Sequence, residues 1–150
     1  MTNTGILVPL WYAAPNAYKR LQALMLDPRA IIVETRVTPH VPRRPEWCRC
    51  GERGLQRTWD PRYYYFSDRS YGSGGGTTEN WLGNTHDQQP EFGIELVNAE
   101  LGIRFLQIGI GQGKTTVLLC AAKGKEGEPC HWKVIVELLR LRMPDLQVIL

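Results

Sequence analysis

Two cysteines and a histidine near the carboxyl end of the chain are the residues best suited to chemistry. Cys120 ends the apolar segment TVLLC (116–120), and Cys130 and His131 follow directly after Pro129. If Pro129 opens a helix, Cys130 and His131 lie in its first turn. There the helix dipole and an imidazolium lower the pKa of a thiol. This pattern predicts a nucleophilic Cys130, with His131 as its base or acid. The alternatives are packing roles, with Cys120 as a small buried apolar residue.

The segments that must position these residues alternate between strand and helix patterns. A strand–helix–strand order within a short span indicates a parallel crossover unit. The chain therefore predicts a single domain over 1–150, an α/β three-layer Rossmann-like sandwich with a mainly parallel sheet. Short apolar runs predict strands at 6–10, 30–34, 116–120 and 146–150.

Three helices are predicted between these strands. The first has Asn16 as its cap and ends near Pro28. The last runs from Pro129 to Pro144. The middle helix has a stripe spaced 3, 4, 4 and 3, with Gly109 as its C-cap; the stripe consists of Ile94, Val97, Leu101, Phe105 and Ile108.

The segment 37–90 has no clear periodicity and is predicted to be a long irregular insertion that is rich in proline, arginine and aromatic residues. Between Arg36 and Arg69 the chain has eight arginines, no lysine and four acidic residues. Rings can stack on bases while guanidinium groups contact phosphates. An alternative reading of the segment is a loop that packs over the sheet with a solvated arginine face.

Ligands of parallel α/β sheets bind beyond the carboxyl ends of the strands. Trp11 follows the first predicted strand, and Glu34 and Arg36 lie at the end of the second. We therefore expect a pocket there, with Arg36 as an anion clamp beside Cys120 and Cys130.

The same residues resemble a known family. The segment VLLCAAKGKEGEPCHWKVIVELL is similar to the carboxyl-terminal signature of the bacterial domain-of-unknown-function 488 family, in which a strand ends in Cys-x-Glu and Cys-His-Arg opens the next helix. IIVETRVTPHVPR is similar to the family's strand ending in Asp-x-Arg before prolines, and WLGNTH to its Leu-Gly-Gly element. A related small family, common near phage genes, has a similar ending. The resemblance implies a bacterial or phage origin and a Rossmann-like fold with a pocket, but no established reaction.

The resemblance applies residue by residue. Arg36, Leu82, Gly83, Cys120, Cys130 and His131 match the motif. Glu34 stands where the family has aspartate, and Asn84, Ala122 and Trp132 replace its second glycine, glutamate and arginine. The expected pocket is then lined by Glu34, Trp11, Gly83 and His86.

Two other sites are weaker readings of the sequence. The stretch GQGKTT resembles a phosphate-binding loop, but that loop needs a glycine five positions before its Gly-Lys pair, where Ile108 stands. A zinc site would have to use Cys-x-Cys spacing, which is poor for zinc. Its candidate ligands are Cys48, Cys50, Cys120, Cys130, His131 and His86.

The leading hypothesis is a small protein that binds an anionic ligand, such as a nucleotide or nucleic-acid fragment, with thiol catalysis as an option. The alternative is a non-enzymatic nucleic-acid-binding protein that uses 36–71, with Arg57, Arg62 and Tyr64 as contacts. A net charge of +3 does not decide between them. Without a long apolar run or a signal pattern, we expect a cytoplasmic protein with no membrane contact. Neither a cofactor nor a bound metal is expected, and the oligomeric state is open.

Overall fold

The computed structural model describes residues 5–36, 39–65, 100–120 and 131–150. Its centre is a five-stranded sheet in the order β3-β2-β4-β1-β5, and the strands pair in parallel. The strands are β1 (Ile6–Trp11), β2 (Ala30–Glu34), β3 (Tyr63–Tyr65), β4 (Thr115–Cys120) and β5 (Gln147–Val148).

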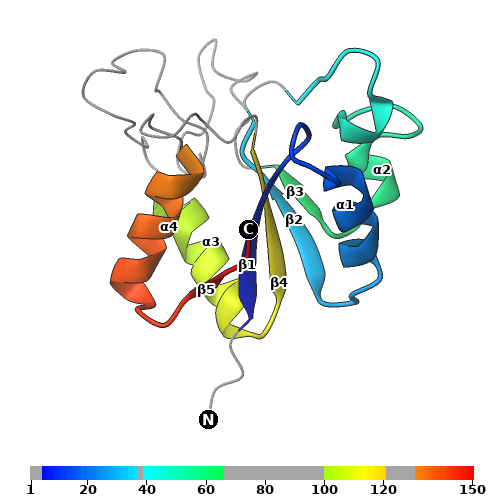
Figure 1. Ribbon diagram of the computed structural model, residues 1–150. Helices are drawn as coiled ribbons and strands as arrows, with labels where there is room; N and C mark the ends of the chain where they lie inside the picture. Colours follow the sequence, from blue (N-terminus) through cyan, green and yellow to red (C-terminus); the bar gives the residue numbers. More distant parts are fainter. Residues whose placement is uncertain (1–4, 37–38, 66–99, 121–130) are drawn as a thin grey trace, which may run out of the picture.

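Helices cover both faces of the sheet. Figure 1 shows α1 and α2 on one face and α3 and α4 on the other. This arrangement confirms the predicted α/β class with a parallel sheet between two helical layers. The helices are α1 (Ala17–Met25), α2 (Leu55–Thr58), α3 (Glu100–Gly111) and α4 (His131–Arg142), with a short 3-10 turn, η1 (Pro45–Trp47).

Two apolar clusters hold the layers together, one on each face of the sheet. Along β2, Ala30 and Ile32 join the cluster under α1, whereas Ile31 and Val33 join the cluster under α3 and α4. A strand that is covered on both faces of the sheet needs apolar side chains on both faces, so its sequence is a continuous apolar run. This is why the central strands are recognisable in the sequence.

The buried face of α3 differs from the predicted stripe. Ile108 is 58% exposed, whereas Ile103, Leu106 and Ile110 are buried. The helix is apolar on more than one side, and periodicity alone cannot choose between two such faces. Gly109 is not the C-cap either, since the helix continues to Gly111.

The Gly-Lys-Thr stretch is the connection between α3 and β4, not a phosphate loop. Gly113 has a φ of 87°, which glycine adopts without strain, and the N–H of Lys114 donates to the carbonyl of Gly109 (3.0 Å). Gly5 packs against this turn. A Cβ on Gly5 would lie 1.8 Å from the carbonyl oxygen of Lys114, so only glycine fits there.

The ends of α1 also depart from expectation. Asn16 has a left-handed φ of 56°, and its side chain makes no capping hydrogen bond, so its predicted role as a side-chain cap is wrong. The chain after the helix is held by Arg62, whose guanidinium donates to the carbonyl oxygens of Met25 (3.0 Å), Asp27 (2.9 Å) and Ala30 (3.2 Å).

The predicted insertion contains regular structure where it is described. Its part 39–65 forms η1, α2 and β3, and 66–90 lies outside the described residues. The chain leaves β2 toward α2, on one face of the sheet, and its next described helix after β3 is α3, on the other face (Figure 1). Among the described residues, no helix has the length and apolarity that a bilayer crossing requires.

Candidate functional site

A buried ion pair closes the carboxyl end of β2. Glu34 ends the strand and Arg36 follows two positions later, so both side chains lie on the same side of the extended chain. The guanidinium of Arg36 donates from Nε to Oε2 of Glu34 (2.8 Å) and from Nη2 to Oε1 (2.7 Å). Arg36 is 4% exposed and Glu34 0%. The bidentate geometry compensates both charges inside the protein.

Tyr63 in β3 completes this network. Its hydroxyl donates to Oε1 of Glu34 (2.7 Å). Burial raises the pKa of Tyr63 well above its ordinary value, and the charge and hydrogen bonding of Glu34 raise it further. Burial lowers the pKa of Arg36, but the hydrogen bond and charge of Glu34 outweigh this, so that pKa is raised. The phenol is therefore neutral and the guanidinium charged. The pairing of β2 with β3 that brings Tyr63 to Glu34 has no signature in the sequence.

Cys120 lies on the opposite face of the sheet from this network. It belongs to the cluster under α3 and α4 and is 0% exposed. The hydroxyl of Thr35 donates to the carbonyl of Leu119 (2.8 Å) and lies 3.7 Å from the Sγ of Cys120. Successive residues of a strand point to opposite faces, which separates Thr35 and Cys120 from Glu34 and Arg36. The side chains of Cys120 and Arg36 therefore lie on opposite faces of the sheet, and Cys120 is packed in an apolar cluster.

Trp11 ends β1 and lies next to Cys120 in the register of the sheet. Its ring stacks on that of Trp132 in α4, with centroids 6.4 Å apart and planes 12° apart. Trp11 is thus at the predicted edge of the sheet, where it contacts the ring of Trp132 and also packs against the apolar cluster under α1.

A cavity of about 250 Å³ lies in the segment that follows β2, lined by Pro39, His40, Cys48, Arg49 and Cys50. The Sγ of Cys48 accepts the N–H of Val41 (3.3 Å) and lies 3.6 Å from Nδ1 of His40. Cys48 is buried, whereas Cys50 is exposed. The cavity therefore contains cysteine, histidine and arginine, the predicted chemistry, but from other residues than those that were predicted.

Arg49 connects this cavity to the carboxyl end of β3. Its guanidinium carbon lies 4.2 Å from the ring centroid of Tyr65, the last residue of that strand, which is close enough for a cation–π interaction. The Nε of Arg49 is buried and has no hydrogen-bond partner among the described residues. The positive charges of Arg36 and Arg49 both act to lower the pKa of Tyr63, against the larger effects that raise it. Arg49 therefore borders the buried network and has an unused donor.

The three residues predicted to contact nucleic acid do not form one surface. Arg57 is exposed on α2. Arg62 is turned inward, onto the three carbonyl oxygens after α1 and the ring of Trp59 at 4.9 Å. Tyr64 is 38% exposed and packs on Phe105 of α3, with ring centroids 4.9 Å apart. Only Arg57 has a guanidinium that is open to a phosphate.

Four predicted site positions lack a described side chain. Gly83, His86 and Cys130 lie outside the described residues, and His131 is described only as the first residue of α4. Within the described ranges, no group of three or more histidine, cysteine or acidic residues is arranged to hold a metal ion.

The residues that the sequence analysis did not single out are Tyr63, Arg49 and His40, whereas Cys48 was named only as a candidate zinc ligand. The available signal was the arginine excess of 36–69, which pointed to this segment but not to a particular arginine. Comparisons of the chain with family models, with curated proteins and with solved structures give no match, so the chemistry of the site rests on its own residues.

Proposed function

We propose that the cavity beside Arg49 binds the anionic group of a small ligand, of which a nucleotide or nucleic-acid fragment is the class that suits it best. The observation that carries this proposal concerns Arg49, a residue that lines the cavity: its Nε is buried and has no hydrogen-bond partner in the part of the chain that the structure describes. Buried donors in proteins almost always have a partner, and an anionic oxygen is the strongest acceptor for a guanidinium.

The surroundings of Arg49 support an anion rather than a neutral ligand. The ring of Tyr65 supports its guanidinium from one side, which reduces the entropy lost on binding. The imidazole of His40 adds a second polar side chain to the cavity wall. The segment 39–65 contains six arginines, no lysine and three acidic residues, so its field attracts anions.

Arg36 is less suited to be the anion clamp than the sequence indicated. Its guanidinium already holds the carboxylate of Glu34 in a buried pair, and breaking such a pair leaves an uncompensated buried charge. Arg49 takes the clamp role in this proposal. The thiol chemistry of Cys130 and His131 stays a separate prediction.

The test is titration of the intact chain with AMP by calorimetry at low ionic strength. We expect Arg49→Gln to weaken AMP binding by about tenfold or more, the effect of losing a charge-assisted hydrogen bond. Arg57→Gln is the matched control, because it removes the same charge from an exposed position on α2. It should change the affinity by about twofold at most through the long-range field alone.

Two outcomes would overturn the proposal. One is equal weakening by Arg49→Gln and Arg57→Gln, which would assign binding to diffuse charge. The other is no binding of AMP or pyrophosphate to the natural sequence at millimolar concentration. Unfolding curves of both variants separate a loss of binding from a loss of folding.

A further inference from the structure

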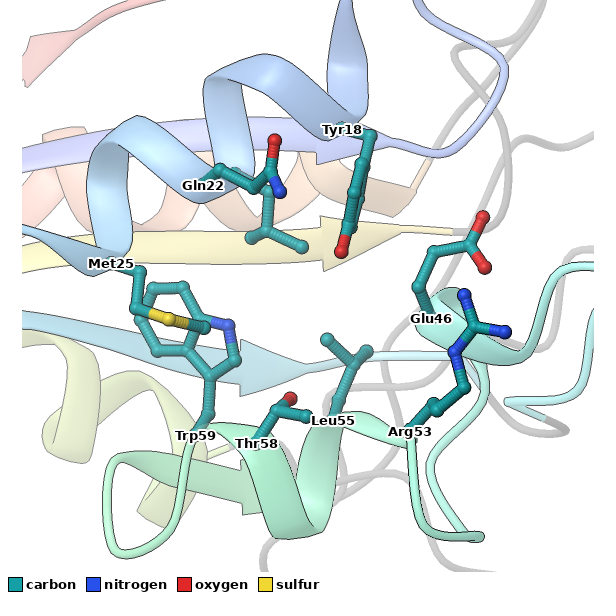
Figure 2. A pocket seen from close by; sticks show the side chains of 9 residues that line it. Tyr18, Gln22, Met25, Glu46, Arg53, Leu55, Thr58 and Trp59 are labelled. Carbon is teal, nitrogen blue, oxygen red and sulfur yellow. The ribbon is translucent and has the colours of Figure 1, made fainter.

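A second cavity, of about 310 Å³, lies between α1 and the η1–α2 segment, and it shares no lining residue with the cavity beside Arg49. Small-molecule sites span roughly 300 to 1,000 Å³, so this volume suits a ligand of one or two rings. The lining residues, shown as sticks in Figure 2, are Tyr18, Leu21, Gln22, Met25, Glu46, Arg53, Leu55, Thr58 and Trp59.

The inner walls of this cavity are apolar. Leu21, Leu55 and Trp59 are each at most 2% exposed. Figure 2 shows Met25 beside Trp59 at one end of the cavity, and Glu46 and Arg53 at the other. A carboxylate and a guanidinium together give that end no net charge, and the apolar walls disfavour a charged ligand. The cavity therefore favours a neutral molecule.

Trp59 gives the cavity a directional polar group. Trp59 is only 1% exposed, and its Nε1 is buried. A buried donor normally has a hydrogen-bond partner, but this Nε1 has none among the described residues. Figure 2 shows the indole nitrogen on the edge of the ring that faces the space between Leu55 and Tyr18. An indole N–H can only donate, so a ligand must bring an acceptor. The neighbouring Met25 has a flexible, adaptable side chain that can give way to such a group.

The indole ring is also in contact with a fixed guanidinium. The guanidinium carbon of Arg62 lies 4.9 Å from the ring centroid of Trp59. Arg62 is itself fixed by hydrogen bonds to the carbonyl oxygens of Met25, Asp27 and Ala30. A donor on a fixed ring loses little freedom when it binds, which favours affinity.

We propose that this cavity binds a small, neutral aromatic molecule with a carbonyl acceptor, and that Trp59 donates its indole N–H to that acceptor. The apolar walls contact the ring of the ligand, and Trp59 selects for the carbonyl. This site is independent of anion binding at Arg49, because the two cavities have no residue in common.

The experiment uses two probes of the same shape. Acetophenone has a carbonyl acceptor, and α-methylstyrene has a methylene group in its place. The Nε1–H resonance of Trp59, assigned by its loss in Trp59→Phe, is followed by ¹H–¹⁵N NMR while each probe is added to the intact chain. We expect acetophenone to shift this resonance and to bind about tenfold more tightly than α-methylstyrene, the ratio for one good hydrogen bond.

Two variants make the result decisive. Trp59→Phe keeps a ring without the donor, so both probes should bind it equally well, as measured on the methyl resonances of Met25. Gln22→Trp places a large side chain at an exposed helix position on the rim, so it should block both probes without disturbing the core. The proposal is overturned if neither probe shifts the Trp59 resonance at its solubility limit, or if Gln22→Trp leaves binding unchanged. It is equally overturned if the two probes bind the natural sequence with the same affinity.

Discussion

Two arginines near the carboxyl ends of β2 and β3 have opposite surroundings. Arg36 is buried, and its guanidinium makes two hydrogen bonds to Glu34. Arg49 lines a cavity, rests on the ring of Tyr65 and has a buried Nε without a partner among the described residues. The two residues are of the same type and lie in the same arginine-rich segment, so the sequence alone does not distinguish them.

The difference shows that the partners of an arginine, and not its position near the strand ends, decide whether it can stabilise the fold or bind a ligand. A guanidinium with a buried carboxylate stabilises the fold, because removing either partner leaves an uncompensated charge. A guanidinium with a buried donor that lacks a partner can bind an acceptor that a ligand brings. On this basis we propose that Arg36 serves the stability of the fold and that Arg49 serves ligand binding.

The largest expected effect is on stability. Arg36→Met leaves the carboxylate of Glu34 buried without its cation, and the free energy of unfolding should fall by about 3 to 5 kcal/mol. Arg49→Met should lower it by less than about 1 kcal/mol, since it removes a single cation–π contact. Urea unfolding measures both values. Similar losses in the two variants would remove the distinction between the arginines.

A double variant sharpens this comparison. Glu34→Leu combined with Arg36→Met removes both charges, so it should recover a large part of the stability that Arg36→Met loses. A double variant as unstable as the single one would show that shape, and not charge compensation, is what Arg36 provides.

The next effect concerns Tyr63. Tyr63→Phe removes a donor from the buried carboxylate of Glu34, so the free energy of unfolding should fall by about 1 to 3 kcal/mol. Tyr64→Phe is the matched control, because Tyr64 is partly exposed in the same strand. Its effect should stay within about 0.5 kcal/mol, and a larger loss for Tyr64→Phe would contradict the assigned network.

Alkaline pH should weaken the same network. The pKa of Tyr63 in the folded protein is raised above its ordinary value of 10.0, so the unfolded chain loses this proton first. The contribution of Tyr63 to stability is full below about pH 10 and decreases above it, by up to about 1.4 kcal/mol per pH unit. Between about pH 9 and 11, the free energy of unfolding should therefore decrease more steeply with pH for the natural sequence than for Tyr63→Phe. If the free energy of unfolding has the same pH dependence in both proteins, Tyr63 ionises in the folded protein as it does in the unfolded chain.

The smallest effect concerns the support of Arg49. Tyr65→Leu removes the ring beneath the guanidinium, and AMP affinity should fall by about two- to fivefold, as expected for a cation–π contact near the surface. Tyr65→Phe keeps the ring and should bind AMP more tightly than Tyr65→Leu. Equal affinities in the two variants would show that the ring does not position Arg49.

The fold was accessible from the sequence where burial leaves a pattern. Strands covered on both faces appear as apolar runs, and the predicted 30–34 coincides with β2. The orientation of α3 was not accessible, because its sequence offers more than one apolar face. The choice of Ile103, Leu106 and Ile110 over Ile108 is made by the helix and sheet it packs against.

The site was less accessible for a related reason. Glu34 and Arg36 were recognised as residues at a strand end, but their mutual pairing removes the charge that made Arg36 look like a clamp. The contact of Arg49 with Tyr65 depends on how the chain returns from η1 and α2 to β3, and local composition does not encode that path. Cys120 and Arg36 were expected to line one pocket, and alternation along the strands places their side chains on opposite faces of the sheet.

The position of β4 has a consequence for the growing chain during synthesis. β4 lies between β1 and β2, which pair with it and not with each other. A nascent chain that has not yet reached Thr115 therefore has both amino-terminal strands but lacks the strand that joins them. Apolar strands with unpaired edges are prone to association with other chains. Between the synthesis of β2 and that of β4, β1 and β2 therefore have strand edges that their partner β4 does not yet cover.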